Sequence, residues 1–128
     1  MTRRNISGGS PFEDVIGYSR VVDDGAYVFV SGTVGFEYTQ GTISEDVVEQ
    51  ARQTFRNIET YLAMAECNLS DIVKATYIVT EPEDWQSVVP IIGEYMREVR
   101  PVATAFVARL VDPRMKIEID VTARRPDR

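Results

Sequence analysis

The chain has 128 residues, of which 44% are hydrophobic and 27% are charged, with a net charge of −6 and no histidine. These values are typical of a folded globular protein, and the acidic balance argues against a nucleic-acid partner, because affinity for nucleic acid depends on clustered Lys and Arg. The lack of histidine and the single Cys67 exclude Ser-His-Asp and Cys-His catalysis and a catalytic zinc site, so we predict no metal and no other cofactor. The length is near the commonest size of a single domain, and we predict one domain over residues 1–128.

A β-hairpin is the first predicted element. Residues 18–22 and 26–33 are rich in β-branched and aromatic side chains, and Asp23-Asp24-Gly25 between them is a turn signal. Residues 35–41 begin and end with glycine and are expected to form a loop.

The first helix is predicted over residues 45–66. Ser44 offers an N-cap, and two acidic residues directly after it complement the helix dipole. Asn68 is expected to end the helix, because Asn tolerates a left-handed backbone. Apolar residues recur at spacings of three and four and form one stripe: Val48, Ala51, Phe55, Ile58, Leu62 and Ala65.

The second helix is predicted after a possible capping box formed by Thr80 and Glu83. Its apolar stripe consists of Trp85, Val88, Ile92, Tyr95 and Val99. Pro90 lies inside this helix and is expected to kink it or to shorten its first half. Three further strands are predicted, over residues 73–80, 102–110 and 115–124.

The predicted order is therefore β-β-α-β-α-β-β, an α+β fold with a mixed β-sheet and two helices on one face. Residues 26–30 and 102–110 are nonetheless apolar on both faces of their strands. A strand that is apolar on both faces is expected to be buried on both. Since the helices cover only one face, the other cover must come from a second subunit, and we predict a homo-oligomer.

The last strand differs, because apolar and polar residues alternate along it. Glu118 and Asp120 share its polar face, roughly 6–7 Å apart in strand geometry. Polar side chains on the face otherwise expected to meet a partner suggest a hydrophilic cleft there.

The sequence contains no membrane or export signal. No apolar run approaches the roughly 18 residues of a membrane-spanning helix, and no apolar signal-peptide core follows the basic start. One cysteine cannot form an internal disulfide, which fits a reducing compartment. The sequence predicts a cytoplasmic protein with no membrane partner.

Four segments together resemble the RidA family, the YjgF-type reactive intermediate deaminases. They are Val15-Ile-Gly-Tyr-Ser-Arg-Val-Val22, Val28-Phe-Val-Ser-Gly32, Gln50-Ala-Arg-Gln-Thr-Phe-Arg-Asn-Ile58, and Arg100-Pro101 leading to Met115-Lys-Ile-Glu-Ile-Asp-Val-Thr-Ala123. The resemblance implies a chorismate-mutase-like fold. It also implies a homotrimer with clefts for small-molecule metabolites between its subunits.

The resemblance also implies site residues. Glu118 matches the family glutamate that positions the attacking water, and Tyr18 and Ser31 match cleft residues. The family arginine that binds the substrate carboxylate has no counterpart, because Pro101-Val-Ala103 places alanine there. Candidates to replace it are Arg20 and Arg114, and less directly Arg100 and Arg109.

Each of these residues also has an ordinary structural explanation. Glu118 could be a solvated edge residue, Tyr18 a packing residue, and Ser31 a partner of the neighbouring loop, while the arginines could form surface ion pairs.

Three functions stay open at this stage. The first is a metal-free hydrolase or deaminase of small imine- or enamine-type metabolites that uses Glu118. The second is a trimer that binds a small metabolite without turning it over, which the missing arginine favours. The third is an endoribonuclease or translation inhibitor, against which the acidic charge and the lack of histidine argue.

Overall fold

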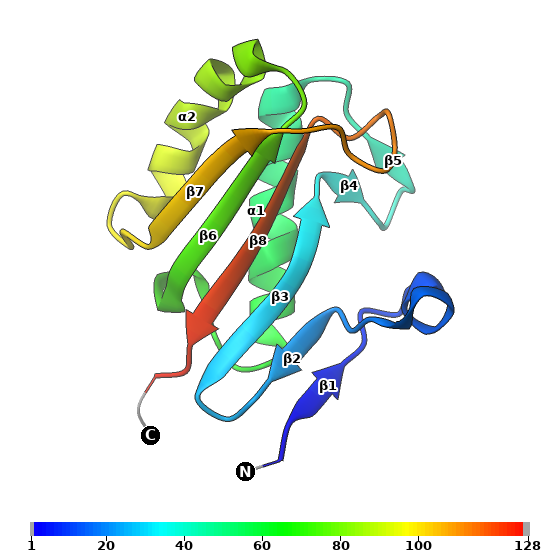
Figure 1. The fold of residues 1–128 in the computed structure, drawn as a ribbon, viewed down its shortest axis with the longest axis vertical. Coiled ribbons are helices and arrows are strands. Elements are labelled where there is room, and N and C mark those ends of the chain that lie inside the picture. The colour runs from blue at the N-terminus through cyan, green and yellow to red at the C-terminus, as the bar shows by residue number, and fades with distance from the viewer. Residues whose placement is uncertain (1, 127–128) are drawn as a thin grey trace.

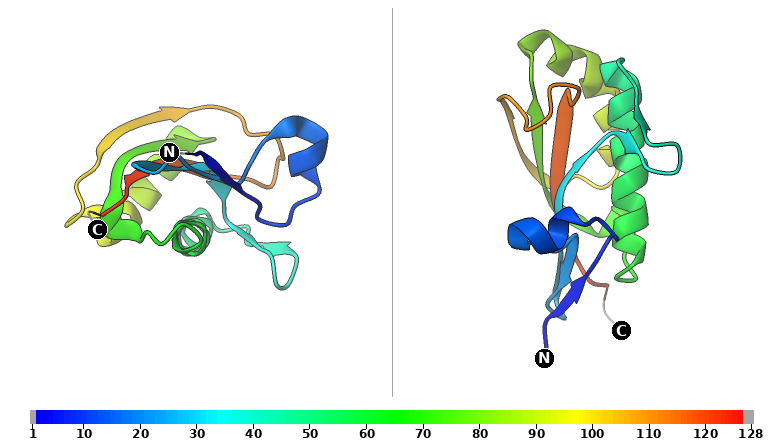
Figure 2. Two further views of the ribbon diagram at one scale, coloured as in Figure 1. Left: turned by 90° about the horizontal axis from the view of Figure 1, so that it is seen from below. Right: turned by 90° about the vertical axis from the view of Figure 1, so that its right-hand side faces the viewer.

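A computed structural model describes residues 2–126, which form a mixed β-sheet with two α-helices packed on one face (Figures 1 and 2). In spatial order the sheet contains β1 (Arg4–Ile6), β2 (Val21–Asp23), β3 (Tyr27–Val34), β8 (Ile117–Arg124), β6 (Ile72–Val79) and β7 (Val102–Val107). Within residues 2–126, β6 and β7 are the only neighbours in this sheet that pair in parallel, and the other neighbours are antiparallel. The predicted α+β class, mixed sheet and one-sided helix layer are confirmed.

The predicted element order is confirmed for β2, β3, α1 (Val47–Ala63), β6, α2 (Pro82–Met96), β7 and β8. Five short elements of residues 2–126 were not expected: β1, a π-helix at Glu13–Gly17, the paired strands β4 (Phe36–Glu37) and β5 (Thr42–Ile43), and a 3-10 helix at Leu69–Asp71. The loop predicted over residues 35–41 is therefore partly wrong. These elements are too short to show a hydrophobic period in the sequence.

The N-cap of α1 is Asp46, not Ser44. The Asp46 carboxylate accepts a hydrogen bond from the Val48 amide at 3.1 Å, whereas the Ser44 hydroxyl accepts one from the Asp46 amide. Both residues can accept a hydrogen bond from a backbone amide near the start of α1. Asp46, which directly precedes Val47, is the one that caps the helix. At the other end, Glu66 rather than Asn68 has a positive φ, and Asn68 instead forms a capping box with Asp71.

The predicted capping box of α2 is wrong. Glu81 is the N-cap without a side-chain hydrogen bond, and Pro82 occupies the first turn, where a missing amide is tolerated. The helix runs without interruption through Pro90, so this proline does not shorten it. Val88 and Ile91 on either side are buried, and this packing offsets the hydrogen bond that proline removes.

Three strands differ from their predicted bounds. Tyr18 lies outside β2, β7 ends at Val107, and β8 begins at Ile117. The connection from β7 to β8 turns at Asp112, whose carboxylate accepts hydrogen bonds from the backbone and side chain of Arg114. These local bonds compete with strand pairing and stop both strands early.

The core lies between the helices and the sheet. The α1 stripe is confirmed: Ala51, Phe55, Ile58, Leu62 and Ala65 are buried, and Val48 packs against them partly buried. Phe55 stacks on Tyr95 of α2 with ring centroids 4.4 Å apart. From β8 the core receives Ile117, Ile119, Val121 and Ala123, as the alternation predicted.

The other face of the sheet carries apolar side chains that nothing in the described chain covers. Phe29 is 43% exposed and Phe106 48%, and every residue of β7 is exposed. The prediction that some strands are apolar on both faces is confirmed for β3, where Val28 and Val30 are buried on the opposite side from Phe29.

Asp23 ties the β2–β3 turn to the end of the chain. Its buried carboxylate lies 2.7 Å from the Arg125 guanidinium and 3.2 Å from that of Arg4. Burial alone would raise the pKa of Asp23, but the Gly25 amide and the two arginines outweigh it and lower the pKa. Arg125 also donates to the Ala65 carbonyl, so the same residue links the sheet to the end of α1.

We expect Asp23→Asn to lower the free energy of unfolding by about 2–3 kcal/mol at pH 7, because a buried charge-assisted pair is lost. A carboxylate with a lowered pKa stabilises the fold above its unfolded pKa and loses that contribution as the pH falls through the folded value. In urea titrations the gap between variant and wild type should therefore close at strongly acidic pH. Asp14→Asn, which removes the same charge at an exposed position outside this ion-pair cluster, is the control, and an equal loss in both variants would contradict the ion-pair role.

Candidate functional site

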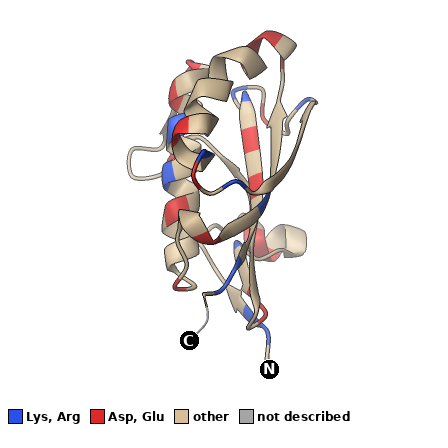
Figure 3. Ribbon diagram, turned by 90° about the vertical axis from the view of Figure 1, so that its left-hand side faces the viewer, with Lys and Arg blue, Asp and Glu red and all other residues tan. Residues whose placement is uncertain are grey.

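The candidate site is centred on Glu118, on the uncovered face of β8. Glu118 is half-buried and stands between Val34 of β3 and Ile78 of β6. The acidic positions of β8 are visible in Figure 3 as red bands on this strand. The predicted alternation therefore places Glu118 and Asp120 on one face, away from the helices.

A β-bulge in β3 shapes the floor of the site. The register passes from Val30 opposite Val121 to Thr33 opposite Ile119, so Ser31 and Gly32 together face one residue of β8. A Cβ atom added to Gly32 would lie 2.6 Å from a carboxylate oxygen of Glu118. Only glycine leaves room for the carboxylate to rest against the backbone there.

The environment of Glu118 favours its protonated form. Burial raises the pKa of Glu118, the Asp120 carboxylate on the same face raises it further, and the Arg20 guanidinium opposes both. A carboxylate with a raised pKa is a stronger base, and this is a property of groups that transfer protons near neutral pH.

Arg20 lies beside the same glycine. One guanidinium nitrogen donates to the Gly32 carbonyl at 2.9 Å and to the Ser31 carbonyl at 3.4 Å, and another donates to the Tyr18 hydroxyl at 3.4 Å. The guanidinium also lies over the rings of Tyr18 and Tyr61, 5.6 Å and 5.0 Å from their centroids. Three predicted site residues, Tyr18, Arg20 and Glu118, therefore converge on the bulge.

Ser31 has a bonded hydroxyl. It donates to the Ser19 carbonyl at 2.6 Å and so holds the chain before β2 against the bulge. The hydroxyl oxygen retains acceptor capacity. The structure thus gives Ser31 a local structural role, and a ligand role stays a prediction.

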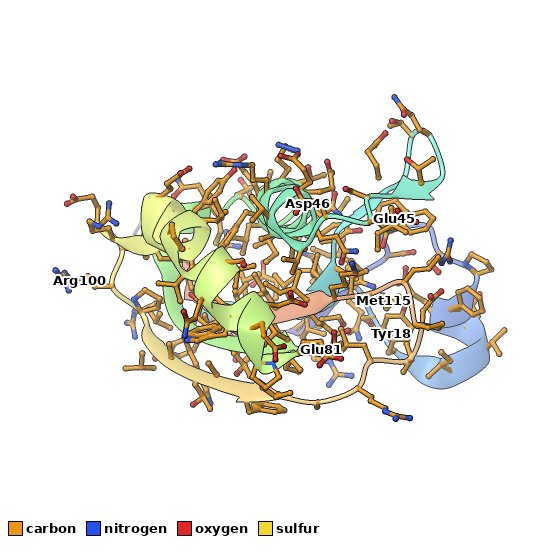
Figure 4. All side chains as sticks on the ribbon, turned by 90° about the horizontal axis from the view of Figure 1, so that it is seen from above. Tyr18, Glu45, Asp46, Glu81, Arg100 and Met115 are labelled. Atoms are coloured by element: carbon orange, nitrogen blue, oxygen red, sulfur yellow. The ribbon has the colours of Figure 1, made fainter. Side chains whose placement is uncertain are left out.

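Arg114 makes its ion pair with Asp112 and not with Glu118. It forms an ion pair with Asp112 at 2.8 Å, which together with backbone hydrogen bonding lowers the pKa of Asp112 to about 2. Its guanidinium lies over Phe36 of β4, 5.8 Å from the ring centroid. In Figure 4 Arg100 lies at the opposite end of the molecule from Tyr18, so it does not join this cluster.

Two buried polar residues of α1 hold the strands that carry the site. Gln50 donates to the Ser44 and Arg114 carbonyls at 2.7 and 2.8 Å and accepts from the Lys116 amide at 2.9 Å. Asn57 donates to the carbonyls of Val34 and Phe36. The start of β8 and the end of β3 are therefore fixed by the same helix.

Sequence reasoning missed several residues that build the site. Gly32 was noted only as part of a Val-Ser-Gly segment, and Tyr61 and Gln50 lie beside the apolar stripe of α1 rather than on it. Tyr61 is buried, which raises its pKa to about 12. In the sequence, these polar residues could have been recognised by their position next to the apolar stripe of α1. That position does not show which residues they contact.

Two kinds of feature are absent from residues 2–126. Between residues 2 and 126, no three or more His, Cys, Asp or Glu side chains form a group that could hold a metal ion. No helix in this part of the chain is long and apolar enough to cross a membrane. Lys and Arg are spread over several elements in Figure 3.

The chain is similar to known proteins in sequence and in fold. Residues 10–125 match the family model described as Endoribonuclease L-PSP. A human 2-iminobutanoate/2-iminopropanoate deaminase is 27% identical over 124 residues, which are 96% of this chain and 90% of that protein. A Mycobacterium tuberculosis member of the YjgF/YER057c/UK114 family has a TM-score of 0.86 at 32% identity, covering 96% of this chain and 99% of that one. E. coli TdcF with bound serine has a TM-score of 0.81 at 25% identity, covering 96% and 94%.

The raised pKa of Glu118 can be measured directly. In a carbon-13 NMR titration, the side-chain carboxyl of Glu118 should titrate above the ordinary value of 4.5. Asp120→Asn should lower the midpoint because a repelling charge is removed, and Arg20→Met should raise it because an attracting one is lost. Glu59→Gln, on the exposed side of α1, should leave it unchanged. A midpoint at or below 4.5 in the wild type would contradict the raised pKa of Glu118.

Proposed function

The chain belongs to the RidA (YjgF-type) family, whose model is described as Endoribonuclease L-PSP, and from this membership we propose that it hydrolyses small imine- or enamine-type metabolites. The chain shares a chorismate-mutase-like fold with its structural relatives, and the proposed site lies on the uncovered face of the sheet. Glu118 is the proposed catalytic residue, and Tyr18, Ser31, Arg20 and Arg114 are proposed ligand contacts.

The observation that carries the proposal is the half-buried Glu118 carboxylate with a raised pKa beside Arg20. A base and a cation at one place suit a substrate that has an electrophilic carbon next to an anionic group. The name of the human relative, 2-iminobutanoate/2-iminopropanoate deaminase, describes substrates of this kind. E. coli TdcF has been solved with bound serine, and serine, like these imines, carries a carboxylate next to the carbon that holds nitrogen. This supports the same ligand class.

In the proposed reaction Glu118 removes a proton from water as the water oxygen bonds to the imine carbon, and passes this proton to the imine nitrogen. The carbon then holds both a hydroxyl and an amino group. Glu118 next takes the hydroxyl proton and delivers it to the nitrogen as the carbon–oxygen double bond forms and the carbon–nitrogen bond breaks, so that a 2-oxo acid and ammonia leave. One imine and one water thus give one oxo acid and one ammonia, with no cofactor in the balance.

The uncovered sheet face supports a homotrimer with clefts between its subunits. Apolar side chains stand on this face on both sides of the polar residues of β8, among them Phe29 and Phe106. Such a surface is stabilised by contact with another subunit. Packing around the polar residues would leave Glu118 in a cleft.

A metabolite-binding trimer without turnover is the second candidate. Ala103, where the family has its carboxylate-binding arginine, favours it, because a missing bidentate contact weakens the hold on a reacting substrate. An RNA-cleaving role, which the description of the family model suggests, has less support, since the chain has a net charge of −6 and no histidine. The single, buried Cys67 supports a cytoplasmic location.

Glu118→Gln tests the catalytic role. It keeps the size of the side chain and removes its basicity, so turnover of 2-iminopropanoate or 2-iminobutanoate generated by an amino acid oxidase should fall by about 100-fold or more. The assay is release of ammonia above the uncatalysed rate, and Glu59→Gln is the matched control. Equal turnover by wild type and Glu118→Gln would rule out Glu118 as the base. Binding of the oxo acid without any turnover by the wild type would favour the second candidate.

Light scattering coupled to size exclusion tests the assembly. The wild type should elute with three times the mass of the chain, and Phe106→Glu should lower that mass because it places a charge on the uncovered sheet face. Val89→Glu is the control, since Val89 is similarly exposed but belongs to α2 in the helix layer. A stable wild-type monomer at micromolar concentration would contradict the trimer.

A further inference from the structure

The segment between β1 and β2, residues 7–20, contains no β-strand, but the buried carboxylate of Glu13 holds it in place. We call residues 7–20 the N-terminal strap. Glu13 in the π-helix is only 7% exposed. It accepts hydrogen bonds from the Ser7 hydroxyl and from the amides of Gly8, Ser10 and Arg20, at 3.0–3.3 Å. Burial alone would raise the pKa of Glu13, but these hydrogen bonds outweigh it and lower the pKa.

The same residue fixes both predicted ligand contacts of the N-terminal strap. The backbone carbonyl of Glu13 accepts from the Tyr18 amide at 3.0 Å, while its carboxylate accepts from the Arg20 amide at 3.3 Å. Gly8, also bonded to the carboxylate, packs so closely on Arg20 that an added Cβ would lie 3.0 Å from the Arg20 side chain. Glu13 therefore determines where the Arg20 side chain begins and which way it leaves the backbone.

Arg20 has donors left for a ligand. Its hydrogen bonds go to the Ser31 and Gly32 carbonyls and to the Tyr18 hydroxyl, which leaves the Nε–H of the guanidinium without an acceptor among residues 2–126. No carboxylate of the described chain lies within ion-pair distance of it. Between two tyrosine rings and beside Glu118, the guanidinium is a fixed cation whose charge is not neutralised by an ion pair.

We propose that Glu13 is a positioning residue: it holds the N-terminal strap so that Arg20 binds the carboxylate of the ligand beside Glu118. The inference rests on the proposed function in one respect, that the ligand lies next to Glu118. It assigns the anion contact, which the family motif would place at Ala103, to the strap instead. The ligand class is a small monocarboxylate with its reacting carbon adjacent to the carboxylate.

The chemistry of Glu13 explains why a carboxylate is needed. A carboxylate only accepts hydrogen bonds and has room for about four of them. A glutamine of the same length offers one oxygen and would turn its NH₂ group toward donors. Glu13→Gln should therefore release part of the strap without removing Arg20.

The test measures binding of pyruvate, a stable 2-oxo acid, by NMR titration to the full-length protein. Glu13→Gln and Arg20→Met should each weaken pyruvate affinity by about tenfold or more. The double variant should bind no more weakly than Arg20→Met alone, because Glu13 acts through Arg20. Asp14→Asn removes the same charge from the next, exposed residue and should bind like the wild type.

Hydrogen exchange of the same proteins reports on the strap itself. Glu13→Gln should speed exchange at the amides of Gly8, Ser10 and Arg20, whereas Arg20→Met should leave Gly8 and Ser10 protected. Wild-type affinity in Glu13→Gln, or a further loss of affinity when it is added to Arg20→Met, would overturn the proposal. So would a wild type that does not bind pyruvate at millimolar concentration. A wild type that binds pyruvate but processes no imine would contradict the hydrolase function alone and leave the strap proposal standing.

Discussion

Both α-helices pack on the same face of the sheet, and the character of the other face follows from this one-sided cover. The apolar residues of β8 turn toward the helices, so the pleat turns Glu118 and Asp120 outward. Phe29 and Phe106 are turned outward on neighbouring strands by the same rule. A polar strand between apolar ones can thus serve at once as a ligand surface and as part of a contact with another subunit.

Within that face, the proximity of Gly32 to Glu118 determines which side chains can meet. The bulge at Ser31 and Gly32 turns two carbonyls toward Arg20, and the missing side chain of Gly32 leaves room for the Glu118 carboxylate. A cation and a partly desolvated base therefore lie beside the same backbone segment. The proposed anion contact of Arg20 depends on this arrangement, since Ala103 has no charged side chain.

Periodic patterns accounted for most of the fold but not for the ends of its elements. The α1 stripe through Phe55 and Leu62 and the alternation of β8 were correctly predicted, because burial on one face repeats along the chain. The caps at Ser44 and Thr80 were wrong: Asp46 caps α1, and the N-cap of α2, Glu81, makes no side-chain hydrogen bond. Helix ends depend on such local alternatives, which leave no period in the sequence.

The sequence by itself determined the element order, the two-sided strands and the outward face of Glu118, since each depends on neighbours along the chain. The tertiary structure alone decided that Glu13 reaches the Arg20 amide, that Arg20 reaches Gly32, and that Gln50 bonds to Arg114, 64 residues away. Hydrogen bonds between distant residues leave no period in a sequence. A single glutamate or glutamine looks the same there whether it is solvated or buried, and only the folded backbone brings its partners within reach.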